Sequence, residues 1–218
     1  MKRRSLPVAA ALAATAALLL TACGSGDDRP SDNDKIAGSD TGDAAASDSP
    51  STGTPNDAGR PSITLPDDMN YAFEGWETGD ATKDAALADA QQALYSVDDA
   101  ITKGDTDSKA LAFYFQGDAL VSEVKWVQAW LDANITWTGT IRYFDPRVTL
   151  SDKKTAVVIY CAYDAKAYNK NRKTDKVDKT ASADSPYVLY NTRMEKNAKG
   201  VWQTTGLLTK RGAEQCSG

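Results

Sequence analysis

The chain has 218 residues, with 25 Lys and Arg, 30 Asp and Glu and no His, so its formal net charge is −5. An acidic chain is a poor match for nucleic acid or for an anionic membrane surface, because both favour clustered Lys and Arg. The absence of His excludes Ser–His–Asp and Cys–His catalytic sets, an imidazole base and the usual zinc sites. We therefore expect no nucleic-acid partner, no metal site and no cofactor.

The N-terminus has the pattern of a secretory signal peptide. Three basic residues at positions 2–4 precede an apolar run over residues 7–20. That run has about 14 residues, whereas a helix that spans a membrane needs about 20. We predict a signal peptide over residues 1–22, and the sequence leaves open whether export uses the general or the twin-arginine route.

The apolar run ends in Leu20-Thr21-Ala22-Cys23, which resembles a bacterial lipobox. The thiol of such a Cys receives a diacylglyceryl group, and the signal peptide is cleaved before that Cys. Two acyl chains anchor a protein far more firmly than one. We predict lipidation of Cys23 and a lipid anchor on the extracytoplasmic face of the cell membrane. The alternative is an ordinary cleaved signal followed by an unmodified Cys.

Residues 23–62 are predicted to form a disordered linker. The segment consists mainly of Asp, Ser, Gly, Thr, Ala and Pro, and Ile36 is its only large apolar residue. It cannot bury enough apolar surface to offset the entropy of ordering the chain. We interpret it as a spacer before one folded domain, residues 63–218, which contains all the Trp, Tyr and Phe residues.

Three helices are expected early in this domain, after a segment with Tyr71, Phe73 and Trp76 that packs back on the later elements of the domain. Asp80 and Gly104 are suited to cap the two ends of the first helix. Its apolar residues recur every three or four positions: Leu87, Ala90, Leu94, Val97 and Ile101. Asp107 or Ser108 caps a short second helix, and a third helix extends from about residue 120 to residue 131.

After residue 134 the apolar period changes to two, which predicts strands. The first strand covers residues 135–143 and is bent or ended by Asp145-Pro146, and the second covers residues 156–163. A long polar loop is expected over residues 166–185, with two further strands over 187–194 and 201–209. The order predicts an α+β fold, with three N-terminal helices packed on an antiparallel sheet of about four strands.

Cys161 and Cys216 remain once Cys23 carries lipid. Disulfides persist outside the cell, and a bond between these two would close a loop of about 55 residues. We predict that bond. The alternatives are two unpaired thiols or a metal site, although a zinc site would have no His ligand here.

Several features together resemble a group of actinobacterial lipoproteins with an NTF2-like (cystatin-like α+β) domain. They are Gly104-Asp105, Thr138-Gly139, Tyr143, Asp145-Pro146, Val148, the Cys161 strand, Gly200-Val201-Trp202 and Cys216. The resemblance covers about residues 75–218. It implies a cone in which a curved sheet wraps against the helices, often with an apolar pocket. It implies no activity, because one fold can serve enzymes, binding domains and assembly modules.

Pairs of Tyr and Asp are the remaining candidates for catalysis. Tyr160, Tyr163 and Asp164 share one predicted strand, and Tyr143 and Asp145 lie near the end of another. A desolvated Asp can take a proton while a Tyr donates a hydrogen bond to an oxyanion. Alternation places Tyr160 and Tyr163 on opposite faces of a regular strand, so they cannot both line one pocket. We predict no catalytic residue.

An aromatic set is the better candidate for function: Trp126, Trp130, Trp137, Tyr143 and Tyr187. In one interpretation these residues line a pocket for a small apolar or carbohydrate-like ligand. In the other they fill the core. The segment 166–179 carries six basic residues, and it either meets an anionic wall polymer or lipid headgroup or is a solvated loop.

Our preferred hypothesis is a membrane-anchored extracytoplasmic lipoprotein with a non-catalytic domain that binds a partner protein or a small ligand. One alternative is an NTF2-like isomerase or hydrolase that uses Tyr and Asp. The other is a dimeric structural or assembly module, paired through the outer face of its sheet.

Overall fold

The computed structural model describes residues 59–180 and 184–217, which all belong to one compact unit. The predicted signal peptide, Cys23 and most of the predicted linker lie outside the described residues. Within the described part of the chain, no helix combines the length and the apolar character needed to cross a membrane.

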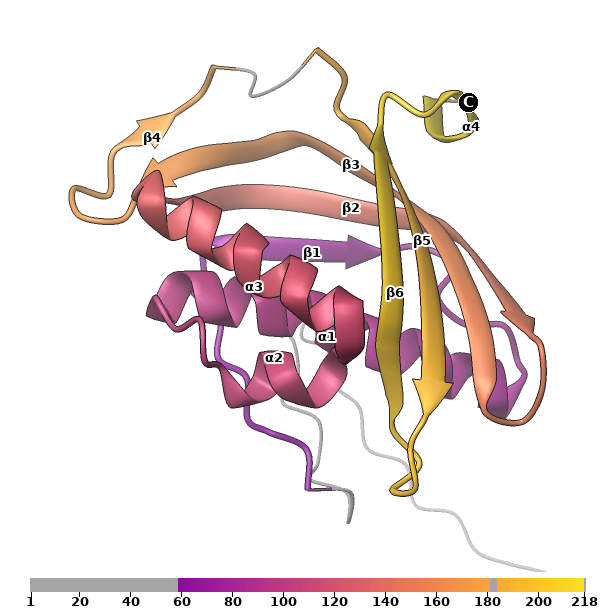
Figure 1. Ribbon diagram of the computed structural model, residues 1–218. Coiled ribbons are helices and arrows are strands. Elements are labelled where there is room, and N and C mark those ends of the chain that lie inside the picture. Colours follow the sequence, from indigo (N-terminus) through magenta and orange to yellow (C-terminus); the bar gives the residue numbers. More distant parts are fainter. Residues whose placement is uncertain (1–58, 181–183, 218) are drawn as a thin grey trace, which may run out of the picture. The chain divides into compact units, whose positions relative to one another are not determined.

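A curved, open sheet of six strands forms one layer of the unit (Figure 1). The strands are β1 (Met69–Phe73), β2 (Ile135–Leu150), β3 (Thr155–Asn171), β4 (Val177–Asp178), β5 (Tyr187–Lys196) and β6 (Trp202–Arg211). Their order is β1-β2-β3-β5-β6, with β4 beside β3. All neighbours are antiparallel except β1, which runs parallel to β2.

The expected sheet of about four antiparallel strands is thus corrected to a mixed sheet of six. The segment with Tyr71 and Phe73 forms the edge strand β1, whose register pairs Tyr71 with Ile141. The predicted polar loop from residue 166 is also shorter than expected, because β3 continues to Asn171 while it pairs with the first half of β2.

The three predicted helices are confirmed as α1 (Ala81–Lys103), α2 (Lys109–Tyr114) and α3 (Gly117–Asp132), and a short α4 (Glu214–Ser217) follows β6. Helix α1 begins where the Asp80 carboxylate accepts hydrogen bonds from two backbone N–H groups, at 2.8 and 3.1 Å. It ends at Gly104, which has a φ of 71°. Helices α1 and α3 lie on the inner face of the curved sheet (Figure 1).

Two irregularities in the long β2–β3 pair bend the sheet. The register shifts just after Phe144, where Asp145 has a φ of 49°. A second shift follows Thr140, beside Gly139, where a Cβ atom would overlap the backbone oxygen of Lys166. Bulges bend a strand and increase its twist, so these two strands can wrap around the helices.

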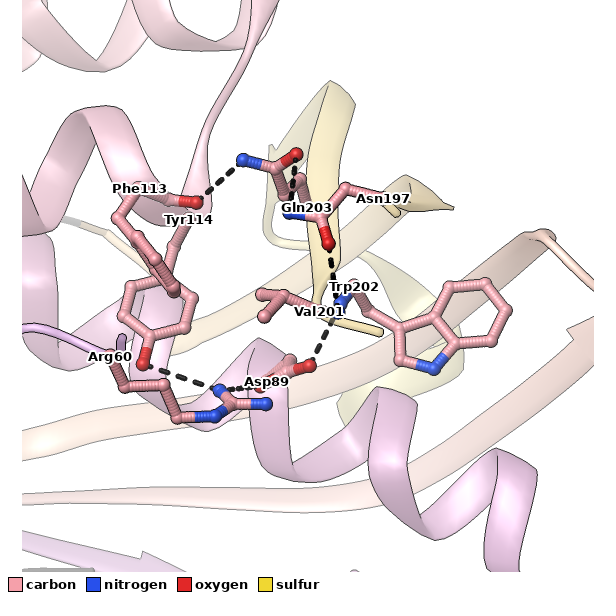
Figure 2. A network of polar contacts seen from close by, with 8 residues as sticks. All are labelled: Arg60, Asp89, Phe113, Tyr114, Asn197, Val201, Trp202 and Gln203. Atoms are coloured by element: carbon pink, nitrogen blue, oxygen red, sulfur yellow. Dashed lines mark hydrogen bonds and ion pairs between the residues drawn. The ribbon is translucent and has the colours of Figure 1, made fainter. Parts of the chain in front are cut away.

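A partly buried ion pair joins the start of the described chain to the helices (Figure 2). Asp89 on α1 is 1 % exposed. One of its oxygens pairs with the Arg60 guanidinium, and the other accepts the backbone N–H of Trp202 at 2.8 Å. Arg60 also donates to the Tyr114 hydroxyl at 3.4 Å. The segment before β1, helices α1 and α2 and the start of β6 are therefore joined around one carboxylate.

The predicted disulfide is confirmed, and it lies on the outer face of the sheet. Cys161 on β3 is bonded to Cys216 on α4, with the two Cα atoms 5.6 Å apart. Both residues are buried together with Ala213, and Phe144 and Tyr187 pack against them. The bond fastens the C-terminal end of the chain to the middle of the sheet.

Candidate functional site

A cavity of about 500 Å³ lies between the inner face of the sheet and helices α1 and α3. Helix α1 turns the small side chains of Ala90 and Ala93 toward it, while the bent strands carry Trp and Tyr residues on the opposite wall. Small residues on the helix and curvature in the sheet leave the two layers apart at this place. The volume falls within the range of about 300–1,000 Å³ that is typical of sites for small molecules.

The structure gathers most of the predicted aromatic set at this cavity. Trp126, Trp130, Trp137 and Tyr143 line it. Trp137 and Tyr143 are deeply buried, whereas Trp126 is 53 % exposed and therefore lies at the mouth. Tyr187 lies instead on the outer face of the sheet, beside the disulfide.

The Tyr and Asp residues that were considered for catalysis are separated. Tyr160 is buried and lines the cavity, while Tyr163 is on the other face of β3, as alternation along the strand predicts. Asp164 reaches the cavity, but both of its oxygens accept hydrogen bonds from Arg211, at 3.2 and 2.7 Å. Asp145 is exposed in the bulge of β2.

A carboxyl group that the sequence analysis did not single out, Asp98 on α1, lies in the wall of the cavity. Its two oxygens accept hydrogen bonds from the Tyr71 hydroxyl at 2.8 Å and from the Trp137 indole at 2.9 Å. Among residues 59–180 and 184–217, no Lys or Arg forms an ion pair with it. Burial raises the pKa of Asp98 to about 6, and the two hydrogen bonds oppose that rise only in part.

A second carboxyl group, Glu123 on α3, lines the same cavity and is 9 % exposed. No described residue donates a hydrogen bond to it or forms an ion pair with it. Burial, and then repulsion from the Asp98 carboxylate, raise the pKa of Glu123 to about 7. Near neutral pH this side chain is therefore poised between its charged and neutral forms.

Tyrosine hydroxyls supply the other polar groups deep in the cavity. Tyr143, Tyr160 and Tyr190 line it, and burial raises the pKa of all three above the ordinary value. Their hydroxyls stay protonated at neutral pH and can donate hydrogen bonds. The rings of Tyr160 and Tyr190 are stacked, with centroids 4.9 Å apart.

The sequence does carry a signal for the two carboxyl groups. Asp98 lies four residues after Leu94, and Glu123 lies three residues after Leu120 and four before Val127. Residues at these spacings share one helix face, so each carboxyl group interrupts an apolar stripe. Across the part of the chain that the structure describes, no three Cys, Asp or Glu side chains gather as a metal site would require.

No protein-family model matches the sequence, and no curated protein matches it. Among solved structures, the chain is similar to a ketosteroid isomerase-like protein from Erwinia carotovora atroseptica, with 15 % identity and a TM-score of 0.37 over 58 % of this chain and 95 % of that one. A protein from Catenulispora acidiphila has 10 % identity and a TM-score of 0.40 over 62 % and 96 %. The intermembrane space region of a chloroplast protein has 11 % identity and a TM-score of 0.38 over 62 % and 100 %.

At these identities and TM-scores the likenesses carry no argument about this chain, so its fold and the chemistry of its site rest on its own residues. The described residues form an α+β unit with helices on one face of a curved, open, mixed sheet.

Proposed function

We propose that this protein is a lipid-anchored extracytoplasmic lipoprotein whose domain binds a small, largely apolar ligand without turning it over. The observation that carries the proposal is the cavity of about 500 Å³ walled by aromatic and aliphatic side chains. A concave apolar site with a few polar groups is the usual form of a small-molecule pocket. The lipobox at Cys23 and the linker of residues 23–62 support the anchor.

The binding proposal is tested by asking whether filling the cavity abolishes binding. Ala167 on β3 lines the cavity, whereas Ala165 on the same strand is exposed and does not. In the full-length protein, Ala167→Trp is expected to abolish the fluorescence enhancement of the neutral fluorophore Prodan, while the matched Ala165→Trp variant keeps it. Equal enhancement in both variants would overturn the proposal.

Native mass spectrometry of the protein purified from its source organism then identifies a natural ligand. A reproducible additional mass that is lost in Ala167→Trp and retained in Ala165→Trp is the expected result. The same additional mass in both variants would show that the bound molecule lies outside the cavity.

The anchor has its own test. Cys23→Ala is expected to release the protein into the medium or to leave an uncleaved precursor, because the acceptor thiol is gone. Ser25→Ala, which leaves Leu20-Thr21-Ala22-Cys23 intact, is the matched control. Unchanged diacyl modification in the Cys23→Ala protein would contradict the lipoprotein proposal.

A second candidate function is proton transfer, and the carboxyl pair favours it. Asp98 and Glu123 have pKa values raised to about 6 and about 7 and share the cavity with protonated Tyr hydroxyls. Such a set can remove a proton and stabilise the resulting oxyanion. Deuterium uptake from D2O at the α-carbon of 2-tetralone, measured by NMR, tests it. A rate that is above the buffer rate and that falls in Asp98→Asn would favour this candidate over simple binding.

A further inference from the structure

Acidic side chains outnumber basic ones in the walls of the cavity. Its walls contain three carboxyl groups, Asp98, Glu123 and Asp164, and Arg211 is the only basic side chain among the lining residues. Arg211 is already engaged with Asp164 through two hydrogen bonds and also donates to the Ser185 carbonyl at 2.9 Å. The Asp164–Arg211 pair is therefore neutral as a unit, and the cavity carries two further acids, Asp98 and Glu123, that have no basic partner among the lining residues.

We propose that the ligand is an organic cation, with an ammonium or amidinium group on an apolar body, and that Glu123 and Asp98 bind its charge. This inference rests on the proposed function, since it specifies the chemical class of the molecule in the same cavity. It follows from the geometry of the carboxyl groups and of the rings around them.

Glu123 is the main determinant. It is more than nine-tenths buried, faces the cavity and has no hydrogen-bond or ion-pair partner among the described residues. A buried carboxyl group normally has a donor or a cation beside it. The oxygens of Glu123 are open to the cavity and are not enclosed by protein, so a group that enters with the ligand can reach them.

Asp98 is fixed in place without being neutralised. Its donors, the Tyr71 hydroxyl and the Trp137 indole, are both uncharged. They hold the carboxylate at the cavity wall and satisfy one lone pair on each oxygen, which leaves acceptor capacity on both. An anionic ligand would meet two carboxylates, whereas a cation would relieve their mutual repulsion as well as their desolvation.

The remaining walls suit a cation because they are aromatic. The faces of Trp and Tyr rings carry negative potential and attract ammonium and amidinium groups. Trp126 and Trp130 lie at the α3 wall with ring centroids 5.9 Å apart, and the stacked Tyr160 and Tyr190 lie on the sheet. A cation that leaves water at the mouth thus finds π faces and carboxylates inside.

The test compares two isosteres that differ in charge, benzyltrimethylammonium and neopentylbenzene, by displacement of Prodan from the full-length protein at pH 8. We expect the cation to bind more tightly than the neutral isostere by about 30-fold, of which roughly tenfold comes from the Glu123 carboxylate and the rest from the aromatic faces. Glu123→Gln keeps the shape of the side chain and removes its charge, so it is expected to reduce that preference by about tenfold or more. Glu77→Gln, an exposed site, is the matched control.

The preference should also depend on pH. The titratable and charged groups that line the cavity together with Glu123 are Asp98, Tyr143, Tyr160, Asp164, Tyr168, Tyr190 and Arg211. Asp98 shares with Glu123 a pKa raised into the range of 5 to 8. Affinity for benzyltrimethylammonium is expected to rise by at least about tenfold from pH 5 to pH 8 as the two acids ionise. Affinity for neopentylbenzene should stay level.

The outcomes separate the two proposals. If neopentylbenzene displaces Prodan as well as the cation does, the inference about charge is overturned while the binding proposal stands. If the preference for the cation persists unchanged in Glu123→Gln, its site is not the one assigned here. If neither compound binds and Prodan enhancement is equal in Ala167→Trp and Ala165→Trp, the binding proposal itself fails.

Discussion

Replacing Glu123 by Gln should stabilise the protein at alkaline pH, against the usual direction for a buried substitution. In the folded protein Glu123 is 9 % exposed and has no partner among the described residues. Its pKa rises from an ordinary 4.5 to about 7, so the folded state binds its proton more tightly than the unfolded state. The free energy of unfolding therefore falls as pH rises from about 4.5 to about 7 and stays lower above that range.

The magnitude follows from the size of the shift. At about 1.4 kcal/mol per pKa unit, the ionised side chain lowers the stability of the folded state by about 3 kcal/mol at pH 8. At pH 5 the folded carboxyl group is almost wholly protonated, and the loss is only about 1 kcal/mol. Glu123→Gln removes the ionisation and keeps the shape, so it should recover about 3 kcal/mol at pH 8 and about 1 kcal/mol at pH 5.

Urea unfolding of the full-length protein, followed by tryptophan fluorescence at pH 5 and pH 8, measures both values. Glu77→Gln makes the same chemical change at an exposed position and should alter stability by less than about 0.5 kcal/mol at either pH. A Glu123→Gln protein with the same pH dependence as the wild type would refute the reasoning, because the carboxyl group would then have found a partner or water.

Two further predictions concern the disulfide and the ion pair that stabilise the fold. Replacing Cys161 and Cys216 together by Ala should lower the free energy of unfolding by about 4 kcal/mol, because the unfolded chain is no longer restricted by a closed loop with a sequence separation of 55. Urea unfolding with and without reductant measures this loss. Reductant should lower the stability of the wild type but leave that of the variant unchanged. Asp89→Ala should cost about 3 kcal/mol, because it leaves the buried Trp202 N–H without its acceptor and removes the carboxylate that pairs with Arg60. An unchanged unfolding midpoint would show that water replaces the carboxylate.

The helices and most of the sheet were accessible to sequence reasoning because their signals are local. Asp80, Gly104 and the stripe between them define α1 without reference to any other part of the chain. Strand β1 carries no such signal. It has five residues, and it forms a strand only because it pairs with the edge of β2, which lies far away in the sequence. The extension of β3 was missed because four of the six residues 166–171 are Lys or Asn. Pairing with β2 and β4 overrides their low strand propensity.

The candidate site also combines residues that local sequence patterns identify with residues that only the fold brings together. Trp126 and Trp130 share a helix face by spacing alone, but their meeting with Trp137 depends on the bend of β2 near Gly139. Asp98 was hidden because a single acid at the margin of an apolar stripe is ordinary on a helix surface. Its significance comes from the second acid, Glu123, which α3 brings to the same cavity.

The ion pair at Arg60 has a mechanical consequence. It lies nine residues before β1, where the chain enters the described unit, and it joins that entry to the buried Asp89 of α1. Force applied to the residues before Arg60 would pass through the ion pair to Asp89, inside the helix layer. Through the Trp202 amide, which donates to Asp89, it would also reach the start of β6. Both points come before the edge strand β1 on this path. A protein held from its N-terminal side, as the proposed lipid anchor requires, would thus be pulled through its core, and the short edge strand β1 would be shielded from peeling.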